Sequence, residues 1–156
     1  MWPKTEERVR LELALLRRLL DDHRDLIERA GQCEPGRTER LALAALLHSF
    51  YTGIESIFKR IALEIDGFLP AGGRSHADLL VQMSSEISVR KPVVGDGLRE
   101  CLGAYMDFRH VFRHAYSFDL VWPKMAGLVA ECPKTLDDIR EQLDRFFGDS
   151  PNATAD

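Results

Sequence analysis

The chain has 156 residues, of which 45% are hydrophobic and 29% are charged, and this balance excludes an intrinsically disordered protein. The formal net charge of -4 at pH 7 excludes a protein that binds nucleic acid over its whole surface, because such binding depends on Lys and Arg neutralising phosphates. A nucleic-acid site, if there is one, must be local.

Helical periodicity begins close to the N-terminus. Apolar residues recur every three or four positions over residues 5–30 and predict a first amphipathic helix, after which the Gly- and Pro-containing run 31–36 reverses the chain. Residues 37–68 predict a long second helix that is apolar over more than half its circumference and therefore central to a bundle. Gly53, in the interior of this helix, predicts a tight helix crossing.

Shorter elements follow. Ser75 is a candidate N-cap for a third helix over residues 75–87, and residues 96–116 predict a fourth helix. We expect a fifth helix to open near Pro123 and a sixth to span residues 135–147.

No stretch alternates with the period of two that strands require. The expected fold class is therefore all-α, an antiparallel bundle of about four long helices with shorter ones appended. We expect one domain over residues 1–148 and a flexible C-terminal tail over residues 149–156.

The cellular compartment of the protein can be inferred from the charged residues within its apolar stretches and from the spacing of its cysteines. The charged N-terminus is unlike a secretory signal, and Arg, Asp or His interrupts each later apolar stretch before about 18 residues, so we expect no membrane segment. Cys33, Cys101 and Cys132 are far apart and outside any C-x-x-C spacing, which is typical of reduced thiols. We therefore predict a cytoplasmic protein.

The segment RHVFRHAY, residues 109–116, concentrates groups suited to phosphodiester chemistry. On an ideal helix Arg109, Arg113 and Tyr116 share one stripe, and His110 and His114 form an adjacent stripe. Imidazole can act as acid or base near neutral pH, and guanidinium groups stabilise charge on phosphate oxygens. The His pair could also ligate a metal, but no well-placed third ligand is evident, so we expect neither metal nor cofactor.

Residues outside this segment are needed to complete the site and to pair its charges. Arg109 and His114 are about 140° apart on an ideal helix, so either the helix distorts or a second copy of the segment completes the site, which predicts a dimer. A buried Glu55 would need a partner, and an Arg of the segment is one candidate. Such Arg- and His-rich strings are also common on solvated bundle surfaces.

The string Arg109-x4-His114-x-Tyr116 resembles the R-x4-H-x-Y signature of HEPN-superfamily ribonuclease toxins, in particular the HepT-like group. The surrounding segments resemble that group in the same order over about residues 5–147. These segments are HSFYTGIESIFKRIA (48–62), SHADLL (75–80), FRHVFRHAYSFDL (108–120) and WPKM (122–125).

This resemblance implies the toxin of a type VII-like toxin–antitoxin system, a homodimer formed through the motif helix, and metal-independent endoribonuclease activity. It implies that Arg109 stabilises the scissile phosphate and that His114 is the acid or base, with His110 and Arg113 in support. Tyr116 matches the tyrosine to which a minimal nucleotidyltransferase antitoxin adds AMP, which would repel RNA. The alternatives are a non-catalytic HEPN subunit that binds a nucleotidyltransferase or RNA, and a plain helical scaffold dimer.

Overall fold

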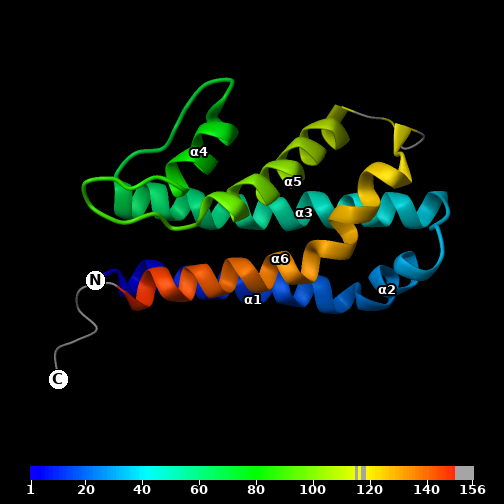
Figure 1. Ribbon diagram of the computed structural model, residues 1–156, viewed down its shortest axis with the longest axis horizontal. Helices are drawn as coiled ribbons and strands as arrows, with labels where there is room; N and C mark the ends of the chain where they lie inside the picture. Colours follow the sequence, from blue (N-terminus) through cyan, green and yellow to red (C-terminus); the bar gives the residue numbers. More distant parts are fainter. Residues whose placement is uncertain (115, 117–118, 150–156) are drawn as a thin grey trace.

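A computed structural model describes residues 1–114, 116 and 119–149, and its described residues form helices and no β-strand (Figure 1). The helices are α1 (Pro3–Asp22), α2 (Arg24–Gln32), α3 (Arg37–Ile61), the π-helix η1 (Ala62–Asp66), α4 (Ser75–Met83), α5 (Asp96–His114) and α6 (Trp122–Gly148). The all-α prediction is confirmed. Of the predicted tail, only Asp149 belongs to the described residues.

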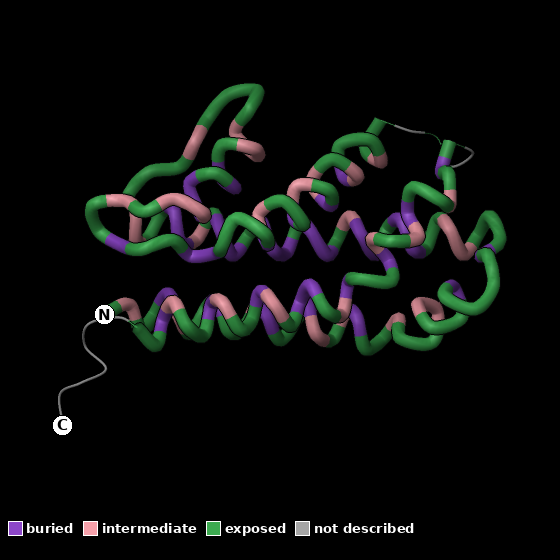
Figure 2. The backbone as a smooth tube through the Cα atoms, viewed as in Figure 1, coloured by how far each residue is buried: buried purple, intermediate pink, exposed green. Residues whose placement is uncertain are grey.

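The long helix α3 is the centre of the bundle. It packs against α1 and α6 on one side and against α4 and α5 on the other (Figure 1). Buried segments recur along its whole length (Figure 2), and Leu43, Phe50, Ile54, Phe58 and Ile61 have no exposed surface. These five residues lie three, four or seven positions apart on one face, and the buried residues Ala44, Leu46 and Gly53 extend the buried surface on both sides of it, as the sequence predicted for a central helix.

The end of this helix differs from the prediction. The α-helical part stops at Ile61, and the chain continues through η1 to Gly67, whose φ of 81° lies in the left-handed region that glycine adopts without strain. The N–H of Phe68 donates to the carbonyl of Ala62 at 3.1 Å and closes this end.

Arg37–Asp66 is long and apolar enough, with a mean hydropathy of 1.4, to cross a membrane by length and composition. His48 interrupts this segment as expected, but it does not lower the hydropathy enough to exclude a membrane span. Within the bundle, however, 61% of the most apolar window is buried, as in the core helix of a soluble protein. Packing against α1, α2, α4, α5 and α6 thus accounts for the apolar character of this segment.

Two other helix boundaries need correction. The predicted first helix is broken at His23, whose N–H donates to the carbonyl of Leu20, so that α1 and α2 are separate helices. The predicted fifth and sixth helices form a single helix, α6, which contains Pro133. Proline removes one backbone hydrogen bond and bends a helix, and α6 changes direction along its length (Figure 1). Burial of Cys132 and Leu136 beside the proline explains why the helix continues.

The tight crossing predicted at Gly53 is present between α1 and α3. A Cβ atom placed on Gly53 would lie 2.5 Å from Cδ2 of Leu16. The absence of a side chain at Gly53 therefore lets α1 approach α3 closely, which compensates for the low helix propensity of glycine.

Candidate active site

Arg109 projects from α5 into the interface with α3. The residue is only 5% exposed, and its Nη2 donates a hydrogen bond to Oε2 of Glu55 at 2.8 Å. The guanidinium carbon lies 4.7 Å from the centroid of the Tyr51 ring, a cation–π geometry, and Nη1 lies 3.4 Å from Oγ1 of Thr52. An arginine of the motif, one candidate partner for a buried Glu55, is therefore its partner in the structure.

Glu55 accepts two further donors. The imidazole Nδ1 of His76, at the start of α4, lies 2.7 Å from Oε2, and Nζ of Lys59, one turn along α3, lies 3.2 Å from Oε1. The side chain of Glu55 is only 4% exposed, whereas those of His76 and Lys59 are 43% and 46% exposed. We call Glu55, Lys59, His76 and Arg109 the Glu55 cluster. Its carboxylate is buried, but two of its donors reach solvent.

The electrostatics of the Glu55 cluster favour anions. Burial alone would raise the pKa of Glu55, but the hydrogen bonds from Arg109, His76 and Lys59 outweigh burial and hold this pKa below its ordinary value. Glu55 is therefore ionised at neutral pH. One carboxylate faces two permanent cations, Arg109 and Lys59, so the cluster has an excess of positive charge within a chain of net charge -4. This is the kind of local positive site that a phosphate would require.

The remaining charged residues of the motif helix lie outside this interface. His110, Arg113 and His114 are exposed, and the rings of His110 and His114 are 5.1 Å apart in an edge-to-face contact, so the predicted histidine stripe is confirmed. The helix is α-helical through His114, so no distortion turns His114 towards Arg109. Within one chain the structure thus leaves Arg109 buried against α3 and His114 exposed to solvent.

Tyr116 does not share the helical stripe of Arg109 and Arg113, because α5 ends at His114. The N–H of Tyr116 donates to Oδ2 of Asp119 at 3.2 Å, and the N–H of Asp119 donates to the carbonyl of Tyr116 at 2.9 Å. Tyr116 thus lies beyond the helix, with 72% of its surface exposed. The neighbouring positions 115, 117 and 118 lie outside the described residues.

A second imidazole lies between the motif helix and α3. The ring of His48 contacts that of Phe112 at 5.6 Å, and Phe112 in turn stacks on Phe108 at 6.2 Å. Burial, together with the positive charges of Arg109 and Arg113, lowers the pKa of His48. His48 is therefore neutral at pH 7 and packs from α3 against the aromatic side of α5.

Within the described ranges, no group of three or more His, Cys, Asp or Glu side chains could hold a metal ion. The three cysteines are free thiols. Burial raises the pKa of Cys132 to about 12, so this thiol is not a nucleophile near neutral pH.

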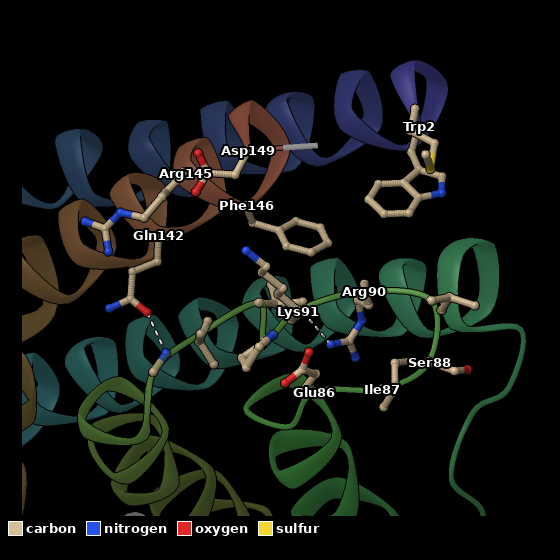
Figure 3. Close-up of a pocket in the computed structure, with 16 residues that line it drawn as sticks. Trp2, Glu86, Ile87, Ser88, Arg90, Lys91, Gln142, Arg145, Phe146 and Asp149 are labelled. Atoms are coloured by element: carbon tan, nitrogen blue, oxygen red, sulfur yellow. Dashed lines mark hydrogen bonds between the residues drawn. The ribbon is translucent and has the colours of Figure 1, made fainter. Parts of the chain in front are cut away.

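A cavity of about 750 Å³ lies far from the motif residues, at the end of the bundle that holds the N-terminus (Figure 3). Trp2 and Phe146, stacked at 5.7 Å, line one side, and the loop that contains Arg90 and Lys91 lines the other. The Oε1 atom of Gln142 accepts the N–H of Gly95 and ties this loop to α6. No residue of the Glu55 cluster or of the segment 109–116 lines this cavity.

The model of a protein family described as HepT-like protein matches residues 42–149, more than two-thirds of the chain. The chain belongs to the HepT-like family of the HEPN superfamily. No curated protein and no solved structure matches it. The matched range begins in α3 and contains the whole Glu55 cluster and the R-x4-H-x-Y residues, whereas α1 and α2 lie outside it, although the sequence resemblance was expected to begin at residue 5.

Two members of the cluster in this HepT-like chain were not singled out from sequence. Lys59 follows Glu55 by four positions, a spacing that places both side chains on one face of a helix, so a signal for it existed. His76 lies 21 positions from Glu55 on another helix, and only the packing of α4 against α3 brings the two together.

Proposed function

We propose that this HepT-like chain is a metal-independent endoribonuclease that acts in the cytoplasm as the toxin of a type VII-like toxin–antitoxin pair. The observation that carries the proposal is the complete R-x4-H-x-Y set at the end of α5, with its arginine held in a cluster of positive charge excess. Membership of the HepT-like family, which is generally a family of ribonuclease toxins, supports it.

In this mechanism the ribose 2′-hydroxyl attacks the adjacent phosphorus, and the bond from phosphorus to the 5′ oxygen breaks. Arg109 stabilises negative charge on the phosphate oxygens, and His114 transfers a proton to or from the reacting oxygens. The exposed side chains of His110 and Arg113 support RNA binding beside them. No cofactor takes part.

The orientation of the motif residues supports a site shared by two copies of the chain. Arg109 and His114 do not converge within one chain, so we propose a homodimer through α5 in which His114 of one copy serves the Glu55 cluster of the other. If so, mixing inactive Arg109→Lys and His114→Ala proteins restores about a quarter of the activity, because half of the dimers then carry one intact site of two. No recovery after subunit exchange would contradict a shared site.

Tyr116 is the proposed site of neutralisation. Its hydroxyl attacks the α-phosphorus of ATP, pyrophosphate leaves, and the phenolic proton passes to a base of the nucleotidyltransferase antitoxin, which leaves AMP on the tyrosine. The 72% exposure of Tyr116 supports access by such a partner. The added bulk and negative charge next to His114 would repel RNA phosphates.

The direct test is cleavage of total tRNA and of a mixed-sequence messenger RNA by the purified chain, with and without EDTA. We expect cleavage that EDTA does not change and that His114→Ala reduces by about 10²- to 10⁴-fold, the usual contribution of one general acid or base. His23→Gln is the matched control, because His23 lies at the break between α1 and α2 and its ring bonds to the carbonyl of Leu19. Equal cleavage by His114→Ala would contradict the proposal.

The burial of Arg109 favours a second candidate function. An arginine side chain that is 7% exposed and already paired with Glu55 is also what a non-catalytic HEPN subunit would contain, where the pair only joins α5 to α3. Such a subunit would bind a nucleotidyltransferase or RNA without cutting it. Stable RNA binding by a preparation that shows no turnover would favour this second function.

A further inference from the structure

The strongest unassigned feature of the molecule is the contact of His76 with the motif arginine. Nδ1 of His76 lies 2.7 Å from Oε2 of Glu55, and Nη2 of Arg109 lies 2.8 Å from the same oxygen. The two nitrogens are themselves 3.2 Å apart. An imidazole therefore lies directly beside the proposed phosphate-binding group within a single chain, where His114 does not.

The hydrogen bond to Glu55 determines which ring nitrogen of His76 carries the proton. An ionised carboxylate only accepts hydrogen bonds, so Nδ1 is the protonated nitrogen. In the neutral ring Nε2 then keeps its lone pair. A carboxylate that holds an imidazole in this way fixes its tautomer and orientation and stabilises the imidazolium that forms when Nε2 takes up a proton.

His76 is also accessible, unlike its two partners. Its side chain is 43% exposed, whereas those of Glu55 and Arg109 are 4% and 7% exposed. A buried carboxylate behind a half-exposed imidazole, with a guanidinium alongside, is an arrangement suited to removing a proton from a group bound next to a phosphate.

We propose that His76 is the general base of the RNA cleavage, a role that rests on the ribonuclease function proposed above. Nε2 of His76 takes the proton from the ribose 2′-hydroxyl as the 2′ oxygen bonds to phosphorus. The bond from phosphorus to the 5′ oxygen breaks, and protonated His114 supplies the proton that this oxygen needs. The products are a 2′,3′-cyclic phosphate and a 5′-hydroxyl, and no oxidant or metal is required.

This assignment gives the two imidazoles different duties. In an in-line displacement the attacking and leaving oxygens lie on opposite sides of phosphorus, so the base and the acid must approach from opposite sides. His76 lies beside Arg109 at the α3–α4 side of the site, and His114 reaches the phosphate from the exposed end of a motif helix. The requirement for a 2′-hydroxyl also restricts the substrate to RNA.

The test compares two substrates of one sequence, built around a bond that the unmodified chain is first shown to cleave. One is ordinary RNA, and in the other sulfur replaces the leaving 5′ oxygen, so that departure needs no proton. We expect His114→Ala to lose about 10²- to 10⁴-fold on ordinary RNA and to recover most of this on the sulfur substrate. His76→Gln loses a similar factor on both, because the attacking hydroxyl still needs its base.

The choice of glutamine separates chemistry from packing. A glutamine amide can donate to Glu55 as Nδ1 of His76 does, but it cannot accept a proton, so a merely structural role predicts that His76→Gln is active where His76→Ala is not. Equal cleavage by His76→Gln and the unmodified chain, or its recovery on the sulfur substrate, overturns the base assignment and leaves the ribonuclease function intact. Failure of the unmodified chain to cleave any RNA overturns both.

Discussion

Two buried arginines, Arg90 and Arg109, stabilise this bundle in different ways. The side chain of Arg90 is fully buried, as is that of its partner Asp66, and its Nε and Nη2 atoms reach both oxygens of that carboxylate at 2.6 and 2.7 Å. Arg90 also donates to the carbonyls of Gln82, Ser85 and Lys91. The donors of the Arg90 guanidinium are thus used almost completely within the protein, and these hydrogen bonds fix the loop between α4 and α5.

Arg109 makes one short hydrogen bond, to Glu55, and its contact with Thr52 is long at 3.4 Å. The carboxylate it uses is shared with Lys59 and His76, both of which reach solvent. The first arrangement is closed and structural, whereas the second keeps donors and positive charge at the surface. Burial of the arginine is common to both sites and therefore does not distinguish a structural ion pair from a candidate active site. The distinguishing feature is the exposure of the other groups that bond to the same carboxylate.

The largest effect expected from this comparison is on stability. Arg90→Ala would leave Asp66 buried with only Gln82 as a side-chain donor and should cost about 3–5 kcal/mol of unfolding free energy, the usual result of breaking a buried ion pair. Arg109→Ala should cost only about 1–3 kcal/mol, because Glu55 keeps Lys59 and His76. Urea unfolding followed by circular dichroism measures both. Equal losses would show that the two arginines are structurally equivalent.

The next effect is on RNA cleavage. Arg109→Lys keeps a positive charge but loses the planar fork, and we expect the cleavage rate to fall by about 10²- to 10³-fold, as when one donor to a transition-state oxyanion is removed. Arg90→Lys is the matched substitution, and its folded fraction should cleave at the unmodified rate. Cleavage rates normalised to folded protein provide the comparison, and equal rates for the two variants would contradict a role for Arg109 in the chemistry.

The sequence predicted the fold class well and some of its boundaries poorly. Apolar periodicity identified α3 as central, and Gly53 located its tight crossing with α1, because both are consequences of burial along one helix. The expected start of a separate helix at Thr135 divided what is a single helix, since local capping signals do not register that Cys132 and Leu136 are held in the core. The break at His23 likewise had no local proline or glycine to announce it.

The features of the site that depend on residue type and on spacing along one helix were predictable from the sequence. The pairing of Glu55 with a motif arginine followed from the cost of burying a lone carboxylate. His76 was not predictable as a partner, because its contact depends on how α4 packs on α3. The predicted position of Tyr116 on the helical stripe was wrong, because α5 ends at His114 and Tyr116 lies outside the helix.

The smallest effect concerns acid. Glu55 has a folded-state pKa below its ordinary value of 4.5, so its interactions stabilise the protein fully above that value, and this contribution is lost as the pH falls through the lowered pKa. Glu55→Gln, which still accepts a hydrogen bond from Arg109, should cost about 1–3 kcal/mol at pH 7. The difference in unfolding free energy between the two proteins should shrink steadily below pH 4.5. A difference that is constant from pH 7 to acid would mean that the charge of Glu55 contributes nothing to stability. The Glu55 cluster would then lack the anion that orients both the guanidinium group of Arg109 and the ring of His76.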